Sequence, residues 1–384
     1  MKNKRKILIC IDWYIPGFKA GGPIRSVSNI VNAFKNEFEI YILTSAYDLG
    51  DTEPYKDIEH NLWHDKDGVF IKYLTKKLLN SSAISSNIKE VAPDVIYLNS
   101  LFSRVFTLMP LAVARKNKIK VVLAPRGMLG QGALDIKKSK KMSFIKMAKL
   151  LGWYKKVTWH ASTKAEAEEI KEQFGKKAKI IVAQNIPLSQ QLEIDDILNR
   201  KKTGKVKFVS VSRIAKVKNL HLAIDAFRLV KTNQQVNFDI YGNIEDEDYY
   251  NSFKNKIRKY KNIEINYKGI ASPHQIAEIY ANADFMLLPT SHENYGHSIV
   301  EAWANGCPVI ISKNTPWKNL HVQDLGWDVD ISDVKNIAQA VQKGIDLDFT
   351  SYIQMVRASY LYFQNQICDE AIVNANRKLF LDEN

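Results

Sequence analysis

The 384-residue sequence has no apolar run of the roughly 18 residues that a membrane-spanning helix needs. Its first residues, 1–11, combine a basic start with a short apolar run and look superficially like a signal peptide. That run is too short, leads into Asp12 and is followed by no small-residue cleavage site, so we interpret it as a first buried strand. We therefore expect a soluble protein located in the cytoplasm.

Cysteine is scarce, with three residues in the whole chain, Cys10, Cys307 and Cys368. The number is odd, and Cys10 and Cys307 lie in or beside predicted strands. This pattern is typical of reduced core thiols in a cytoplasmic protein. It argues against both a disulfide framework and a cysteine-based metal cluster.

Zinc-ligand spacings and the aromatic-basic strings of RNA-binding modules are absent too, although the formal net charge is +14. A nucleic-acid partner is therefore not expected. An anionic membrane surface or a phosphate-bearing substrate remains to explain the excess of positive charge.

What the sequence does contain is an alternation of strand-like and helix-like segments. This alternation predicts parallel sheets with helices on both faces. A polar, charged connector interrupts it between residues 187 and 202, so we place a domain boundary near Asn185. The predicted strands are 6–11, 39–44, 69–73, 94–98, 120–124, 157–161 and 179–183 before the boundary, and 207–212, 238–241, 264–267, 285–288 and 309–312 after it.

One stretch, residues 287–310, organises the second half. It predicts a buried strand, a polar turn, a helix from about Gly296 to Asn305 and a second buried strand. Glu293 would lie on the loop at a strand end, and Glu301 inside the helix. Acidic residues near a helix start are common as caps, but here two carboxylates and an anion-attracting helix terminus come together.

The whole string resembles the Glu-x7-Glu signature of family 4 retaining glycosyltransferases. Asn294 and Tyr295 depart from the Gly-Phe that is usual in that family. The resemblance implies that Glu293 and the amides of Asn294, Tyr295 and Gly296 hold the donor sugar and its phosphates, and that Glu301 binds the ribose. The matching positions are Pro289, Glu293, Gly296, Glu301, Ala302, Gly306, Pro308, Val309 and Ile310.

Two further strings of the second half resemble the same family. Residues 210–220 resemble its Ser-Arg-x-x-x-x-Lys-Gly segment, with Asn219 where glycine is usual. The resemblance implies that Arg213 and Lys218 neutralise a leaving diphosphate, as a guanidinium and an ammonium can. Gly242 matches the family's glycine after the next strand.

The first half carries weaker signals. Gly21, Gly22 and Arg25 lie where the family has a Gly-Gly loop that faces the donor phosphates. The string 125–129 resembles the Pro-Arg-Gly-Met-Leu of a polysaccharide-building branch, so Arg126 is an acceptor-side candidate. An arginine paired to a surface acid is the alternative. His160 is a second acceptor-side candidate or a structural residue.

Residues 137–156 contain eight lysines among apolar residues. A helix of this kind could lie on an anionic membrane surface at the inner face of the cell membrane. The alternative is a helix packed on the sheet with solvated lysines. The sequence leaves both interpretations open.

Taken with the resemblance, these features predict a GT-B fold: two doubly wound, Rossmann-like domains that face a central cleft, with a C-terminal helix crossing back. The expected domains are 1–185 with about 366–384, and 186–365. The expected activity is retaining, metal-independent hexosyl transfer without a cofactor, from a UDP- or GDP-sugar to a glycan or lipid-diphosphate-linked acceptor in O-antigen or capsule synthesis.

Three other interpretations stand beside this one. A metal bound by Asp328 and Asp330 is one, although a strand end and turn suits that triplet better. A sugar-nucleotide epimerase of the same architecture is another. A non-enzymatic, basic membrane-surface protein is the third.

Overall fold

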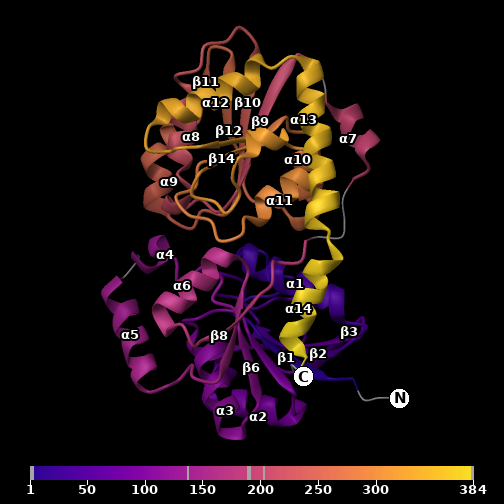
Figure 1. Ribbon diagram of the computed structural model, residues 1–384, viewed down its shortest axis with the longest axis vertical. Helices are drawn as coiled ribbons and strands as arrows, with labels where there is room; N and C mark the ends of the chain where they lie inside the picture. The colour runs from indigo at the N-terminus through magenta and orange to yellow at the C-terminus, as the bar shows by residue number, and fades with distance from the viewer. Residues whose placement is uncertain (1–3, 136–137, 188–191, 202–203, 382–384) are drawn as a thin grey trace. The chain divides into compact units, whose positions relative to one another are not determined.

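A computed structural model of the protein describes residues 4–135, 138–187, 192–201 and 204–381. The chain forms two compact units. Unit 1 comprises Met1–Ile186 and Glu370–Asn384, and unit 2 comprises Pro187–Asp369. Each unit is built around its own sheet (Figure 1).

The sheet of unit 1 has the strand order β3-β4-β2-β1-β5-β6-β7-β8. Its neighbouring strands pair in parallel except β3, which runs antiparallel to β4. The bounds are β1 Lys6–Cys10, β2 Glu39–Ser45, β3 Trp63–Lys66, β4 Val69–Leu74, β5 Val95–Leu98, β6 Lys120–Leu123, β7 Val157–Ala161 and β8 Lys179–Val182.

Helices cover both faces of this sheet, as the continuous burial of its central strands requires. Helices α1 and α14 pack on the face that carries Ile7 and Ile9, and α2, α3, α5 and α6 pack on the face that carries Leu8 and Cys10. The bounds are α1 Gly22–Phe34, α2 Ser81–Val91, α3 Met109–Asn117, α4 Gln131–Asp135, α5 Lys138–Leu150, α6 Lys164–Phe174 and α14 Glu370–Phe380.

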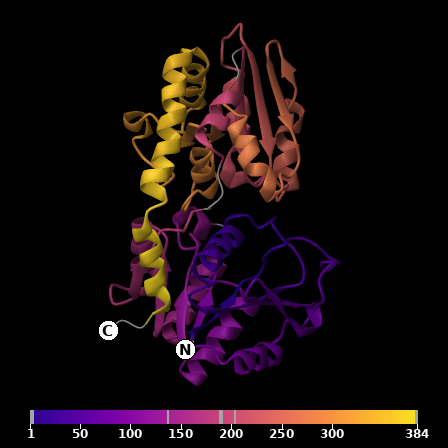
Figure 2. The ribbon, with the colours of Figure 1, turned by 90° about the vertical axis from the view of Figure 1, so that its right-hand side faces the viewer.

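Helix α14, the last of the chain, belongs to unit 1 and lies along it in Figure 2. The ring of Phe380 packs against Phe34 at 5.9 Å and Phe38 at 5.8 Å between centroids. Asn376 Nδ2 donates to the carbonyl of Gln184 at 2.7 Å. These contacts make the C-terminal helix part of the core of the first unit.

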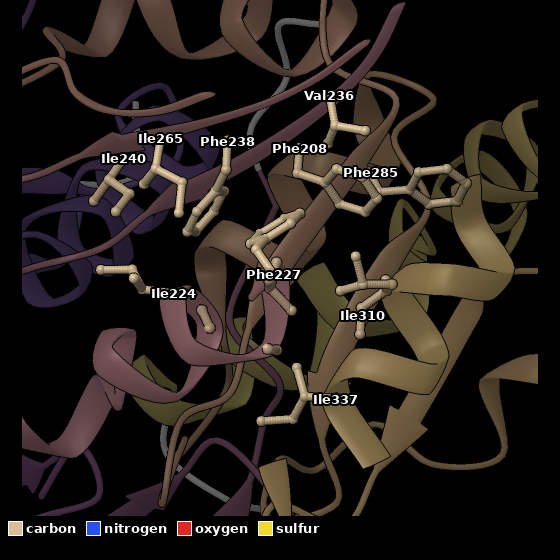
Figure 3. Packing of buried hydrophobic residues seen from close by; sticks show 14 of the residues in the cluster. Phe208, Ile224, Phe227, Val236, Phe238, Ile240, Ile265, Phe285, Ile310 and Ile337 are labelled. Atoms are coloured by element: carbon tan, nitrogen blue, oxygen red, sulfur yellow. The ribbon is translucent and has the colours of Figure 1, made fainter. Parts of the chain in front are cut away.

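The sheet of unit 2 has the order β11-β12-β10-β9-β13-β14-β15 and is parallel except for the short edge strand β11. Phe208 is central to its core, with ring centroids 5.2 Å from Phe227 and 5.5 Å from Phe285 (Figure 3). The bounds are β9 Lys205–Val211, β10 Gln235–Tyr241, β11 Lys259–Tyr260, β12 Ile263–Tyr267, β13 Phe285–Leu288, β14 Val309–Ser312 and β15 Gly326–Val329.

The helices of unit 2 again pack on both faces. Helices α8, α9 and α12 contribute to the cluster around Phe208, while α10 and α11 pack on the opposite face with Val209 and Val211. The bounds are α7 Ile194–Arg200, α8 Leu220–Phe227, α9 Glu247–Phe253, α10 Ile276–Ala281, α11 His297–Ala304, α12 Val334–Asp346 and α13 Phe349–Tyr362.

Each sheet contains a point at which the direction of winding reverses. In unit 2 the chain runs outward from β9 through β10 to β12 and then returns to pair β13 on the other side of β9. In unit 1 the same reversal falls between β1 and β5. Ligands of doubly wound sheets bind at such switch points, beyond the carboxyl ends of the strands. The predicted two doubly wound domains are thus confirmed, and each has a defined place for a site.

Candidate functional site

Two loops leave the switch point of unit 2 side by side. Strands β9 and β13 pair in parallel, with Phe208 opposite Phe285 and Val209 opposite Met286. The loop after β9 contains Arg213 and a 3₁₀ turn, Lys216–Lys218, and the loop after β13 contains Glu293. Because parallel neighbours end at the same edge of a sheet, residues 75 positions apart in the sequence meet here.

Hydrogen bonds to one carbonyl fix these loops together. The carbonyl of Val217 accepts from Ser291 N at 2.8 Å, from Thr290 Oγ1 at 3.0 Å and from Ser291 Oγ at 3.1 Å. Thr290 itself is fully buried. The 3₁₀ turn therefore has a fixed position relative to the loop after β13.

This connection places Lys218 against Glu293. Lys218 Nζ lies 2.5 Å from Glu293 Oε2, and the two side chains are 12% and 18% exposed. A charged group that is mostly removed from water is stable only if it is paired. The pair is therefore the main electrostatic feature of this end of the sheet.

Arg213 takes part in a different ion pair. Its guanidinium donates to Glu245, which lies between β10 and α9, and both side chains are 39% exposed. An ion pair this exposed contributes about 0–1 kcal/mol, so a competing anion could replace Glu245 as the partner of Arg213 at little cost. The three residues predicted to be catalytic thus lie on two neighbouring loops, in two separate ion pairs.

Gly242 has a structural reason to be glycine. It follows β10, and a Cβ at this position would lie 1.7 Å from the carbonyl oxygen of Ser212. Ser212 N donates to Tyr241 O at 3.0 Å, which holds the start of the Arg213 loop against the end of β10. The close approach of these two backbones sets the position of Arg213.

Helix α11 begins at the site without a side-chain cap. The N-cap of α11, Gly296, has a φ of 84°. Because glycine has no side chain, it cannot cap the first N–H groups of the helix. A Cβ on Gly296 would lie 2.8 Å from Ile299 Cδ1 and 3.3 Å from Glu293 Cγ. Glycine at this position lets the loop pass close to Glu293 and enter the helix at once.

The side chain of Tyr295 is buried, and its carbonyl accepts from Trp317 Nε1 at 2.7 Å. Its ring packs 5.7 Å from that of Trp317 and 5.0 Å from that of His297. The tyrosine that departs from the usual phenylalanine is thus a core residue, and its backbone amide is the part near the helix start. Asn294 is half-buried beside Glu293.

Glu301 lies within α11 and is buried. Its backbone carbonyl accepts from Asn305 Nδ2 at 2.9 Å. The structure thus places one glutamate on the loop and the other on the helix of a single strand-loop-helix unit. This is the arrangement that the spacing of eight residues predicted.

Comparison with known proteins bears directly on this unit. Residues 191–359 match the model of the family Glycosyl transferases group 1. The matched residues lie within unit 2. The match includes Arg213, Lys218, Glu293 and Glu301 within its limits.

Solved structures resemble the chain over almost its full length. Anabaena HepE, in a complex with UDP and glucose, has a TM-score of 0.70 at 14% identity and covers 98% of each chain. The glycosyltransferase WaaG, involved in lipopolysaccharide biosynthesis, has a TM-score of 0.66 at 13% identity, covering 97% of this chain and 99% of its own. The predicted GT-B fold is therefore confirmed.

A curated relative, the alpha-monoglucosyldiacylglycerol synthase of Streptococcus pneumoniae, is 30% identical over 122 residues. The match covers 30% of this chain and 26% of the relative. The chain thus aligns with about a quarter of that protein's length.

Outside the glycosyl transferases group 1 domain, unit 1 holds the other predicted site residues. Gly21 is the N-cap of α1 with a φ of 67°, Gly22 is the first residue of that helix and Arg25 follows within its first turn, half-buried. No neighbouring atom lies within 4 Å of a Cβ built on Gly21, so its backbone conformation is the reason for glycine.

Arg126 neither faces a surface acid nor projects freely towards an acceptor. Its guanidinium donates to Asn185 Oδ1 at 2.5 Å, to Asn99 Oδ1 at 2.7 Å and to Tyr97 Oη at 2.7 Å. These partners come from two segments of unit 1, the end of β5 and the stretch after β8. The arginine therefore cross-links the strand ends of this unit, which corrects the alternative of a surface ion pair.

His160 is a structural residue of the same network. It is fully buried, with Nδ1 2.8 Å from Tyr97 Oη and Nε2 2.8 Å from the carbonyl of Ala183. Burial, with the nearby charge of Arg126 as a second cause, lowers the pKa of His160 to about 3. A fully buried, neutral imidazole with both nitrogens engaged cannot contact an acceptor directly.

Asp12, at the switch point of unit 1, is not among the predicted site residues. Asp12 follows β1, and its Oδ1 accepts from Ser103 Oγ at 2.7 Å. Burial raises the pKa of this carboxyl, and the hydrogen bond from Ser103 partly opposes the rise. Its position just after a predicted central strand was the signal that could have identified it.

Asp328 and Asp330 each accept a hydrogen bond from a backbone N–H. Asp328 Oδ1 accepts from Leu320 N at 2.9 Å, and Asp330 Oδ1 accepts from Ser332 N at 2.9 Å. Within the described ranges, no cluster of three or more His, Cys, Asp or Glu side chains is arranged to hold a metal ion. In those ranges, too, no helix is long and apolar enough to cross a membrane.

Proposed function

We propose that the protein is a family 4 glycosyltransferase that transfers a sugar from a nucleotide-diphosphate sugar, UDP- or GDP-linked, with retention of configuration and without a metal. The observation that carries the proposal is the Lys218–Glu293 pair at the switch point of the glycosyl transferases group 1 domain. The neighbouring loop with Arg213 and the uncapped start of α11 supply further groups that favour a diphosphate.

The chemistry follows from where charge develops. As the bond between the anomeric carbon and the diphosphate oxygen breaks, the diphosphate gains negative charge and the sugar gains positive charge. The negative charge on the diphosphate is stabilised by Lys218, Arg213 and the N–H groups of α11. The positive charge on the sugar is stabilised by the carboxylate of Glu293. The acceptor oxygen bonds the anomeric carbon from the same face, and its proton passes to the departing phosphate.

Lys218 and Glu293 can both act without separating. An ammonium has three N–H donors, so Lys218 can bind Glu293 and still donate to phosphate oxygens. In this arrangement Glu293 fixes the position of the ammonium before the donor arrives. Glu301 would bind the ribose, and Gly21, Gly22 and Arg25 of unit 1 would contact the donor phosphates.

For the acceptor we propose a glycan, linked to a lipid diphosphate, in the synthesis of a bacterial surface polysaccharide such as O-antigen or capsule. The Pro-Arg-Gly-Met-Leu string at 125–129 supports this class. Two relatives also support it, because one is named for a glucosylated diacylglycerol and another for lipopolysaccharide biosynthesis. A cytoplasmic enzyme that works at the inner membrane face would fit such an acceptor.

Ligand-induced thermal stabilisation tests the donor. UDP or GDP sugars at 100 times their dissociation constant should stabilise the protein by about 2.7 kcal/mol. This ligand-induced stabilisation should disappear in Lys218→Ala. It should persist in Lys216→Ala, which removes an exposed lysine from the same 3₁₀ turn. Equal shifts in both variants would contradict the assignment of Lys218.

Product analysis then separates the possible activities. With donor and acceptor, transfer should give a product with the anomeric configuration of the donor, and turnover should persist in EDTA. Conversion of the donor without any acceptor would instead indicate an epimerase. Failure to bind any nucleotide sugar would indicate a non-enzymatic surface protein, and loss of turnover in EDTA that manganese restores would contradict metal independence.

A further inference from the structure

The C-terminal end of α5, in unit 1, exposes large apolar side chains. Leu150 is 88% exposed, Leu151 52% and Met147 45%. The same helix buries Ile145 and Ala148 against the core of unit 1. Figure 1 shows α5 at the left margin of that unit. The helix is therefore packed along one side, with an apolar end that its own unit does not cover.

The backbone explains why these leucines stay outside. Gly152 has a φ of 61°, its N–H donates to Lys149 O at 3.0 Å, and Trp153 N donates to Ala148 O at 2.9 Å. This is the Schellman arrangement that ends a helix and reverses the chain. Trp153 turns back into the unit and packs 5.9 Å from Phe144. The turn leaves Leu150 and Leu151 at its outer side.

Positive charge surrounds this apolar end. Residues 138–156 contain no aspartate or glutamate. We call Met147, Leu150 and Leu151, with the four exposed lysines beside them, the α5 tip. Those lysines are Lys146, Lys149, Lys155 and Lys156.

The lysines at the other end of the helix are placed differently. Lys141 Nζ donates to the carbonyl of Ala133 at 2.6 Å and lies 5.6 Å from the ring of Phe102. Lys137 lies outside the described residues. Within the described residues of α5, 138–150, the exposed large apolar side chains are all at the C-terminal end of the helix.

We propose that the α5 tip inserts into an anionic lipid bilayer. Leucine and methionine side chains enter the boundary of the acyl chains, while lysines extend to the lipid phosphates around them. A protein partner fits less well, because the tip has three apolar side chains and no exposed arginine or aromatic anchor of the kind that dominates protein interfaces. This inference does not depend on the proposed transfer reaction.

Vesicle co-sedimentation of the full chain tests it. The protein should sediment with vesicles of phosphatidylcholine and phosphatidylglycerol in equal amounts, and not with pure phosphatidylcholine. Leu150→Ser with Leu151→Ser should weaken the partitioning by about tenfold or more. Leu62→Ser, which removes another exposed leucine of unit 1, should leave it unchanged.

Matched charge variants locate the contact. Lys146→Ser with Lys149→Ser should reduce binding about fivefold per lysine, whereas Lys138→Ser with Lys140→Ser, of equal charge change, should reduce it much less. In a complementary measurement, the fluorescence of the tryptophan introduced by Leu150→Trp should be quenched by lipids brominated on the acyl chain. The fluorescence of the tryptophan introduced by Leu62→Trp should not.

Three results would overturn the proposal. The first is an absence of binding by the wild type, and the second is equal losses from the two lysine pairs, which would mean attraction by overall charge. The third is binding that survives the double leucine change, which would mean contact without insertion. Nucleotide-sugar stabilisation, measured on the same variants, should be unchanged throughout, so failure here is distinguishable from failure of the proposed transfer activity.

Discussion

The ion pair at the strand ends of unit 2 allows a double-mutant cycle with a defined expectation. Lys218→Met removes the ammonium and leaves the carboxylate of Glu293, 18% exposed, without its partner at 2.5 Å. Breaking a buried pair costs about 3–5 kcal/mol, and the residual exposure places the expected cost at about 3 kcal/mol. For a unit of this size, that cost lowers the melting temperature by about 6–12 °C.

The double variant should recover much of this loss. Lys218→Met with Glu293→Gln leaves no unpaired charge. The double variant should therefore lose about 2 kcal/mol less free energy of unfolding than the two single variants lose in sum. Calorimetric or denaturant unfolding of the four proteins measures this coupling. The exposed Arg213–Glu245 pair is the matched control, because its cycle should give a coupling of about 0–1 kcal/mol.

Under the proposed function, the same cycle has a second outcome in kinetics. Each single change should lower kcat by about 10²–10³, the effect of losing one electrostatic contact in the transition state. Because Lys218 and Glu293 act as one unit, the double variant should lose about as much as the worse single variant. Strict additivity in both stability and kcat would show that the two side chains do not act together, and would refute the reasoning from their contact.

Three further predictions concern single residues. Glu301→Gln should mainly raise the donor KM, because ribose contacts change little as the sugar bond breaks; a large fall in kcat in steady-state kinetics would contradict this. His160 has a pKa of about 3 when folded against about 6.5 when unfolded, so the unfolded chain binds more protons between these values, and stability falls as the pH falls. From pH 7 to 5 the wild type should lose about 2 kcal/mol more than His160→Gln in denaturant unfolding, and equal losses would count against a buried neutral imidazole. Gly242→Ala, with its Cβ 1.7 Å from Ser212 O, should destabilise more than Gly50→Ala, where a positive φ alone costs about 1 kcal/mol; a smaller loss of melting temperature at Gly242 would contradict the close approach.

The doubly wound architecture could be predicted because buried parallel strands have a strong sequence signal. Strands covered on both faces form continuous apolar runs, such as Phe285–Leu288, between turn residues. Once two such runs are assigned to neighbouring strands, the residues after them are expected at one edge. The positions of Glu293 and Arg213 on strand-end loops follow from that rule.

Two edge strands, β3 and β11, escaped prediction for the opposite reason. Strand β3, Trp63–Lys66, is half-exposed to exposed throughout, and β11 is two residues long. Of β15, Gly326–Val329, only the end was predicted, at Asp328, and three of its four residues are partly exposed. Strands of this kind lack the apolar run or the alternation from which a strand is recognised. The helix predicted over 137–156 ends at Leu150, because the Schellman turn at Gly152 outweighs the continuing lysine-rich pattern.

Side-chain pairing was not predictable from the sequence. Lys218 and Arg213 were equal candidates as cations for a diphosphate, yet one pairs with Glu293 and the other with Glu245. The difference depends on loop contacts, above all the three hydrogen bonds to the carbonyl of Val217. Likewise, the string around Arg126 marked this arginine as an acceptor-side candidate but did not indicate the asparagines and tyrosine that bind it.

The different burial of the two cations gives them different tasks in the proposed reaction. Lys218, 12% exposed and held by Glu293, keeps one position whether or not a diphosphate is present, so it adds a fixed positive charge without reorganising during the reaction. Arg213, 39% exposed, is held by a weaker pair that a diphosphate can replace. A guanidinium that changes partners can follow the diphosphate as it gains charge and departs, whereas the buried ammonium defines where the bond to the sugar breaks. The catalytic contribution of Lys218 therefore depends on Glu293, and that of Arg213 on how readily it leaves Glu245.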